Sequence, residues 1–159
     1  MISFDQDNRR FKYRVAGLCI HDKYVLLTKA DQDDYWILPG GRIELLEDSR
    51  ATLRRELLEE TGYEAQIENP LRIVENFFDL DGISFHELAF VYAFSPNGPT
   101  ILNNTWTHQT KDGDVHTELQ WFELDHLEHV DFQPGFLKPL LRDPLETPCH
   151  MIAREPHQK

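Results

Sequence analysis

The chain has 159 residues, of which 40% are hydrophobic and 28% charged, a composition typical of one compact soluble domain. Sixteen Lys and Arg residues against 28 Asp and Glu residues give a formal net charge of −12 at pH 7. This sign argues against binding to a nucleic acid polymer, whose phosphate backbone selects a basic surface. It does not exclude a single nucleotide, because bound metal ions can reverse the local field.

The start of the chain and its cysteines indicate the compartment. Residues 1–10 are polar and charged, and no apolar stretch has the length of a signal peptide or a membrane span. We therefore expect a cytoplasmic protein with no membrane partner. Cys19 and Cys149 lie far apart and show no metal-ligand spacing, so both are expected to be free thiols.

Most of the chain consists of short apolar segments between polar turns, which is the pattern of β-strands. Turns are predicted at residues 21–23 and 80–82, and a break near Pro70 interrupts the third strand. The predicted strands are residues 13–20, 24–29, 63–78, 83–95, 101–107, 115–122 and 149–154.

The clearest helix is predicted over residues 50–60, which contain neither proline nor glycine and have Thr52 as their one β-branched residue. Asp48 or Ser49 can cap its start, and Gly62 can cap its end.

Two shorter helices are predicted near the end of the chain, at residues 125–128 and 134–142, the second shortened or kinked by Pro139. Strands outnumber helices, so we expect an α/β (α+β) fold in which helices pack on the faces of a mixed β-sheet. Nothing divides the chain, and residues 1–159 are expected to form a single domain.

Three glutamates cluster on the predicted helix. Glu56, Glu59 and Glu60 stand at spacings of three and four, so their side chains share an arc of about 100°. Carboxylates at this spacing repel each other, and the helix dipole disfavours anions near the C-terminus. A divalent cation would relieve both penalties. The alternative is a solvated acidic face balanced by Arg54 and Arg55.

The helix belongs to a longer pattern of glycines and charged residues. From Gly41, five residues lead to Glu47 and seven more lead to Arg55-Glu56-Leu57, after which Glu59-Glu60, Gly62 and Tyr63 follow. This pattern, residues 41–63, resembles the Nudix hydrolase signature over its whole length. Pro39-Gly40-Gly41 and Glu44 resemble the loop that usually precedes the signature.

Two positions depart from the usual Nudix pattern. Tyr63 stands where the family usually has an aliphatic residue, and a Tyr ring can still bury most of its area, so only local repacking is expected. Leu45-Leu46 replace a glycine-containing pair that is common before the glutamate of the box, which predicts a stiffer and more apolar loop. Neither change removes a chemical group.

The resemblance implies a Nudix-type αβα sandwich and a metal-dependent pyrophosphohydrolase. Such an enzyme cleaves a phosphoanhydride bond of a nucleoside di- or triphosphate derivative by water attack on phosphorus, with Mg²⁺, or Mn²⁺ in its place. The implied metal ligands are Glu56, Glu59, Glu60 and the carbonyl of Gly40. Arg55 would orient a carboxylate through a two-pronged hydrogen bond. The implied supporting residues are Gly41, Glu44 and Glu47.

The general base stays open at this stage. Glu59 and Glu56 are candidates within the box, since family members differ in the glutamate they use. Glu118 is a candidate beyond it, because it follows the polar stretch 108–114 and precedes Trp121, a placement similar to that of the extra glutamate in MutT-like members. Otherwise Glu118 is an ordinary surface residue of a strand.

For the substrate, the sequence offers cations and aromatic rings. Arg14 and Lys29, in the first two predicted strands, are candidates for phosphate contacts. Phe78 is the candidate for stacking on a base, although aromatic residues in strands are more often part of the core. Phe77, Phe85 and Trp106 are further aromatic candidates.

The expected partner is a nucleotide-type small molecule, with a homodimer left open. A catalytically silent Nudix domain that binds a nucleotide as a sensor is the alternative function. Silent versions would be expected to lose the carboxylates of the box, and this chain keeps Glu47, Glu56, Glu59 and Glu60.

Overall fold

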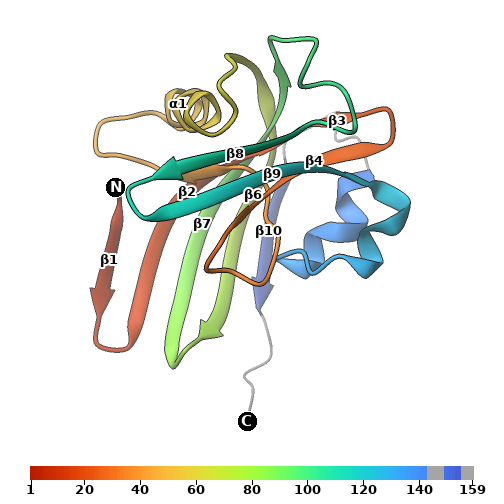
Figure 1. Cartoon of the computed structure of the whole chain (residues 1–159). Helices are drawn as coiled ribbons and strands as arrows, with labels where there is room; N and C mark the ends of the chain where they lie inside the picture. The colour runs from red at the N-terminus through yellow and green to blue at the C-terminus, as the bar shows by residue number, and fades with distance from the viewer. Residues whose placement is uncertain (143–148, 155–159) are drawn as a thin grey trace.

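The computed structural model describes residues 1–142 and 149–154 and contains two β-sheets with one α-helix packed over them (Figure 1). The first sheet has the order β1 (Ser3–Gln6), β2 (Arg9–Leu18), β7 (Ile83–Pro96), β6 (Ala65–Leu80), β10 (Cys149–Arg154), with β5 (Gly40–Arg42) paired to β2. The second has the order β3 (Ile20–His21), β4 (Tyr24–Ala30), β9 (Val115–Glu123), β8 (Thr107–Asp112).

The first sheet is mixed, as the sequence predicts. Strands β2 and β7 are parallel, as are β6 and β10, whereas β6 and β7 form a long antiparallel hairpin. The predicted break near Pro70 is a shift of register rather than an interruption, because β6 is one strand from Ala65 to Leu80 and only its pairing with β7 shifts between residues 67 and 72. The fold is therefore of the predicted α+β class with a mixed sheet.

The helix α1 (Ser49–Thr61) covers one side of the sheets, and the 3₁₀ helices η1 (Leu124–His129) and η2 (Gly135–Arg142) lie at the far end of β4 and β9 (Figure 1). One core cluster joins Leu53 and Leu57 of α1 to Leu119 and Trp121 of β9. A second cluster, which contains Leu137 of η2, fills the opposite face of the sheets. The sheets are thus covered on both faces, with η1 and η2 in place of further α-helices.

The predicted ends of α1 are confirmed. Asp48 is the N-cap, and its carboxylate accepts hydrogen bonds from the backbone N–H groups of Arg50 and Ala51, both at 2.9 Å. Gly62 ends the helix with φ 76°, and its N–H donates to the carbonyl of Leu58. This left-handed conformation favours glycine because a Cβ atom would be strained there.

The strand predicted at residues 101–107 is wrong. Residues 101–105 form turns, and strand β8 runs from Thr107 to Asp112, so most of it lies in the stretch 108–114 that is expected to be a polar link. The apolar character of Ile101 has another cause, because its side chain is fully buried in the core under α1. Its carbonyl accepts a 2.8 Å hydrogen bond from the indole nitrogen of Trp121.

Other differences concern short elements. Strands β1, β3 and β5 are not predicted, because each has only two to four residues and no alternating apolar pattern. The two helices predicted near the C-terminal end are 3₁₀ rather than α-helical. In η2, Pro139 lacks the N–H that an α-helical hydrogen bond requires.

Both cysteines are free thiols, as predicted, with Cys19 buried and Cys149 half-buried. In the described part of the chain, no helix is long and apolar enough to cross a membrane.

Candidate functional site

The two glycines before the acidic helix allow three elements to approach closely. Gly40 has φ 143°, and a Cβ atom there would lie 2.2 Å from the carbonyl oxygen of Val15 on β2. A Cβ atom on Gly41 would lie 2.3 Å from the carboxyl carbon of Glu56. Gly40 therefore requires glycine, and at Gly41 the absence of a side chain lets the backbone of β5 lie directly against the carboxylate of Glu56.

Arg55 organises the carboxylates on the open side of α1. Its Nε and Nη2 atoms donate to the two carboxylate oxygens of Glu47, at 3.1 and 3.0 Å, and Nη1 donates to Glu56 Oε1 at 2.8 Å. The two-pronged partner of Arg55 is thus Glu47, in the loop, rather than a glutamate of the helix. Thr52 also donates to Glu47, at 2.7 Å.

These contacts change the acidity of the groups involved. Hydrogen bonds from Arg55 and then Thr52 lower the pKa of Glu47 to about 2, because they stabilise the ionised carboxylate. The same bond to Glu47 raises the pKa of Arg55. Glu44, the other residue expected to support the loop, accepts from the N-terminal ammonium group of Met1. The loop is therefore tied to the first half of α1 through Glu47 and to Met1 through Glu44.

The three glutamates of the helix differ in environment. Burial, followed by the charge of Glu56, raises the pKa of Glu60 to about 8, while Arg14 and a backbone hydrogen bond from Gly40 act against it. Oxygen Oε2 of Glu60 is buried without a hydrogen-bond partner. Burial also raises the pKa of Glu56, although Arg55 opposes this. The Glu59 side chain is 60% exposed, 3.6 Å from Arg55.

The residues present fit a divalent cation in their chemistry. The charge of Glu56 raises the pKa of the buried Glu60, the charge of Glu59 raises the pKa of Glu56, and Oε2 of Glu60 has no hydrogen-bond partner. Hard cations such as Mg²⁺ take oxygen ligands of this kind. Within residues 1–142 and 149–154, however, no three Asp, Glu, His or Cys side chains already converge as a metal-binding group.

A cavity of about 330 Å³ opens on the side of the first sheet opposite α1. Its lining includes Lys12, Arg14, Asn76, Phe78, Glu87 and Gln133. The predicted candidates Arg14 and Phe78 therefore share one cavity. Arg14 also connects that cavity to the box, because its charge lowers the pKa of both Glu56 and Glu60.

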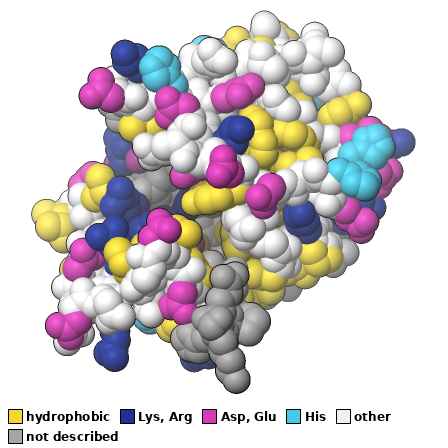
Figure 2. Space-filling model, turned by 60° about the horizontal axis from the view of Figure 1, so that its bottom comes forward, with side chains coloured by type: hydrophobic (Ala, Val, Ile, Leu, Met, Phe, Trp, Pro, Cys, Tyr) yellow, Lys and Arg dark blue, Asp and Glu magenta, His cyan; other side chains and the backbone are white. Residues whose placement is uncertain are grey.

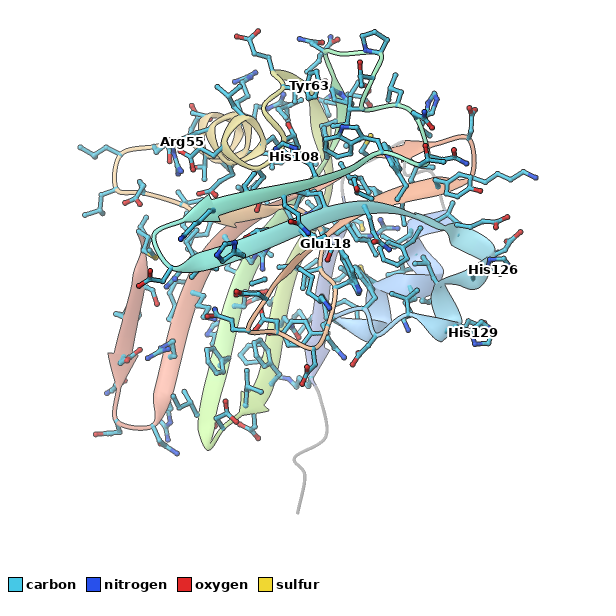
Figure 3. The ribbon with its side chains drawn as sticks, in the orientation of Figure 1. Arg55, Tyr63, His108, Glu118, His126 and His129 are labelled. Carbon is cyan, nitrogen blue, oxygen red and sulfur yellow. The ribbon has the colours of Figure 1, made fainter. Side chains whose placement is uncertain are left out.

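The other substrate candidates lie elsewhere. Lys29 is outside the lining of the cavity, and its ammonium group lies 5.2 Å from the centre of the Trp36 ring. Phe77, next to Phe78 on β6, stacks on His86 at 4.3 Å. Trp106 stacks on His108 and packs against the core under α1, with His108 labelled in Figure 3.

Glu118 lies on β9 and Arg55 lies on α1, and in the view of Figure 3 strand β8 is drawn between these two labelled residues. Its cross-strand partner is Lys29 on β4. The next residue, Leu119, packs into the core with Leu53 of α1. Because successive side chains alternate between the two faces of a strand, the side chain of Glu118 lies on the face of β9 opposite α1. No hydrogen bond or ion pair among the described residues joins Glu118 to the box.

The sequence reasoning missed the polar residues of the cavity, namely Lys12, Asn76, Glu87 and Gln133. Glu87 gives a signal in retrospect, because it is a charged residue inside the longest apolar strand, β7. Asn76 gives a weaker one inside β6. Tyr63, labelled in Figure 3, packs against Gly98, where a Cβ atom would lie 2.4 Å from the ring. The absence of a side chain at Gly98 therefore leaves room for the Tyr63 ring.

The two sheets, the helix α1 and the box together have the arrangement of a Nudix domain. The family model described as the NUDIX domain matches residues 11–143. The chain therefore belongs to the Nudix family.

Two relatives illustrate the similarity in sequence. Diphosphoinositol polyphosphate phosphohydrolase 2 of Rattus norvegicus is 35% identical over 74 residues, which cover 44% of this chain and 41% of the rat protein. The chain thus matches about two fifths of that relative's length. The uncharacterized Nudix hydrolase YvcI of Bacillus subtilis is 29% identical over 115 residues, or 72% of this chain and 67% of the relative.

Among solved structures, the fold is similar to that of a mutator MutT protein from Bacillus halodurans. The TM-score is 0.58 at 19% identity, and the match covers 90% of this chain and 88% of the other. At that identity the likeness concerns the fold alone.

Proposed function

We propose that this protein is a divalent-metal-dependent pyrophosphohydrolase that cleaves a phosphoanhydride bond of a nucleoside di- or triphosphate derivative by water attack on phosphorus. The observation that carries the proposal is the position of Arg14. It lines the 330 Å³ cavity, its Nε atom is buried without a hydrogen-bond partner, and its charge acts on both Glu56 and Glu60. A phosphate bound to Arg14 would lie next to the carboxylates of the box.

The proposed metal ligands are Glu56, Glu59, Glu60 and the carbonyl of Gly40, with Mg²⁺ or Mn²⁺ as the ion. When bound, the ion would supply neutralisation of phosphate charge and activation of water. Arg55 holds Glu56 in place and is itself held by Glu47, so this pair positions the carboxylates before substrate arrives. Catalysis of this class depends mostly on positioning and charge neutralisation.

The general base is proposed to be Glu59 or Glu56, with Glu118 as the alternative. Support for the box comes from the exposure of Glu59 beside Arg55 and from the lack, among the described residues, of a hydrogen bond or ion pair between Glu118 and the box. The variant Glu118→Gln separates the two. A full rate in that variant would assign the role to the box, and a loss of about 10²-fold or more would assign it to Glu118.

A nucleotide suits the cavity better than the many phosphates of a diphosphoinositol polyphosphate, the substrate class in the rat relative's name. In the cavity the cations Lys12 and Arg14 are accompanied by the acidic residues Asp79 and Glu87. In the face shown in Figure 2, basic side chains are likewise interspersed with acidic ones. A highly phosphorylated ring would need a more uniformly basic site.

The proposal is tested by phosphate release over a panel of nucleoside diphosphate derivatives, nucleoside triphosphates and a diphosphoinositol polyphosphate, with Mg²⁺, Mn²⁺ or a chelator. We expect turnover of nucleotides only when metal is present. The variant Glu59→Gln should lower kcat by orders of magnitude, while Glu64→Gln, at an exposed residue just beyond the helix, should leave it unchanged.

Absence of turnover on every compound, together with measurable nucleotide binding, would overturn the proposal in favour of a nucleotide sensor.

The proposal includes a cytoplasmic location and a monomer or homodimer as the active species. Light scattering on the purified protein distinguishes these two assemblies.

A further inference from the structure

The helix α1 contains two buried threonines, Thr52 and Thr61, which use their hydroxyl groups differently. Thr61 follows the usual helical pattern, because its hydroxyl donates to the carbonyl of Leu57, four residues earlier, at 2.6 Å. The Thr52 hydroxyl instead lies 2.7 Å from Oε2 of Glu47, a residue of the loop, and 3.2 Å from the carbonyl oxygen of Asp48. Thr52 thus reaches beyond the helix, although its side chain is fully buried.

The single hydrogen of the Thr52 hydroxyl is available to Glu47. A hydroxyl donates one hydrogen bond, and the carbonyl of Asp48 already accepts from the backbone N–H of Thr52 at 3.0 Å. The start of the helix does not need the hydroxyl either, since the carboxylate of Asp48 caps it through the N–H groups of Arg50 and Ala51. Thr52 therefore donates to the closer and charged acceptor, and hydrogen bonds of this kind are stronger than those between neutral groups.

This hydrogen bond is the first of a series of contacts that ends at a carboxylate of the box. Oε2 of Glu47 accepts from both Thr52 and Nη2 of Arg55, while Oε1 accepts from Nε of Arg55, so both oxygens of that carboxylate are held. Nη1 of Arg55 then donates to Oε1 of Glu56. Figure 3 shows Arg55 on the side of α1 where the loop enters the helix. The orientation of Glu56 is therefore coupled to that of Glu47.

Thr52 is suited to fix the loop because it is rigid. Its branched Cβ leaves few rotamers on a helix, and the core surrounds it. The two residues before Glu47, in contrast, are the exposed Leu45 and Leu46, so neither anchors the loop by packing. Leu46 also has φ 65°, a conformation that costs free energy for a residue with a side chain. The bonds that Glu47 accepts from α1 therefore hold this end of the loop.

We propose that Thr52 is a positioning residue of the box. Its hydroxyl orients Glu47, and Glu47 in turn holds Arg55 and Glu56 in the arrangement that binds the divalent cation. This inference rests on the proposed function. Removing a group that orients the ligands of a metal lowers metal affinity or activity by about 10–100-fold. Without the hydroxyl, the carboxylate of Glu47 loses the bond at 2.7 Å and rotates more freely against Arg55.

The variants Thr52→Val, Thr52→Ser and Thr61→Val test the inference. Valine has the shape of threonine without the hydroxyl, whereas serine retains the hydroxyl. We expect Thr52→Val to lower both kcat and the affinity for Mn²⁺ alone, measured by calorimetric titration, by about tenfold. KM for the nucleotide at saturating Mn²⁺ should stay unchanged, because Thr52 does not line the cavity. Thr52→Ser should recover most of the loss. Thr61→Val, which also loses a hydroxyl buried in α1, is the matched control and should keep the wild-type values.

A second measure needs neither metal nor turnover. Because the Nε–H group of Arg55 donates to Glu47, it should give a slowly exchanging signal in ¹⁵N NMR spectra of the wild type and of Thr61→Val. The same signal should exchange faster in Thr52→Val. If the wild type hydrolyses no nucleotide, the proposed function fails, while the affinity for Mn²⁺ and the NMR signal still decide the inference.

Wild-type kcat and Mn²⁺ affinity in Thr52→Val would overturn the inference, whether or not the NMR signal changes. Equal losses in Thr52→Val and Thr61→Val would also overturn it, because the cause would then be a general loss of stability. If Thr52→Val fails to fold, Thr52→Ala against Thr61→Ala makes the same comparison, since alanine is the residue that helices favour most.

Discussion

At the scale of single residues, the contact between Gly41 and Glu56 shows why the box needs a glycine before its helix. The backbone of Gly41 occupies the space beside the carboxylate of Glu56 so closely that a methyl group would overlap it. Glu56 is also the helix carboxylate that Arg55 holds at 2.8 Å. Displacing Glu56 would therefore disturb the network as well as one proposed metal ligand.

We predict that Gly41→Ala lowers kcat/KM by at least about 10²-fold while the protein stays folded, because the clash is with a side chain that can rotate away. The control is Gly135→Ala, since nothing lies within 4 Å of a Cβ atom at Gly135, and its activity should match the wild type. Circular dichroism and the assay with the best nucleotide would check both. Equal activities for the two variants would show that the position of Glu56 is not critical.

The identities of the charged residues in the box could be predicted from the sequence, but not their environments. Spacing alone places Glu56, Glu59 and Glu60 on one helix face. The structure makes Glu59 exposed and buries Oε2 of Glu60, because Gly40 and Arg14 approach from β5 and β2. These contacts join residues far apart in the chain, and no pattern within the helix contains them.

At the scale of elements, the loop between β5 and α1 carries an unusual backbone. Leu46 has φ 65° and a fully exposed side chain, and its neighbour Leu45 is 78% exposed. A left-handed conformation is costly for a residue with a branched side chain, and glycine adopts it freely. The loop thus holds its shape against a local strain, next to Glu47 and its bonds to Arg55.

We predict that Leu46→Gly is more stable than Leu45→Gly by about 1–2 kcal/mol, since only the first substitution relieves a positive φ. Both variants lose a similar exposed side chain, so the comparison removes the effect of surface polarity. Urea unfolding of the two variants at neutral pH measures the difference. Equal midpoints with equal slopes would show that the loop is not strained at Leu46.

The elements themselves were predictable where the local pattern is strong. The long strands and α1 follow from apolar periodicity and from the caps at Asp48 and Gly62. The strand predicted at residues 101–107 is wrong because the apolar residue Ile101 lies in a turn and packs into the core, so its hydrophobicity does not indicate a strand. Short strands such as β5 depend on a partner strand, β2, which local sequence does not reveal.

At the scale of the whole molecule, the acidic box couples the protonation of Glu60 to global stability. The chain carries a formal net charge of −12, and Glu60 is kept from ionising easily by burial and by the neighbouring Glu56. Its pKa rises from 4.5 to about 8 in the folded protein, so without metal the folded state retains a proton that the unfolded state loses. The stabilisation is complete below pH 4.5 and is lost as the pH rises through 8.

We therefore predict that, in the presence of a chelator, the free energy of unfolding contributed by this site falls between pH 5 and 8, by about 1.4 kcal/mol for each step of one in pH. Glu60→Gln should remove this fall, because the amide stays neutral at every pH, and should be more stable than the wild type at pH 8. Excess Mg²⁺ should stabilise the wild type at pH 8 far more than the variant, since the ion favours the ionised carboxylate. Urea unfolding at pH 5.5 and 8, with and without Mg²⁺, measures these differences against the exposed control Glu64→Gln. An identical pH dependence in Glu60→Gln and the wild type would mean that Glu60 ionises in the folded protein as easily as in the unfolded chain.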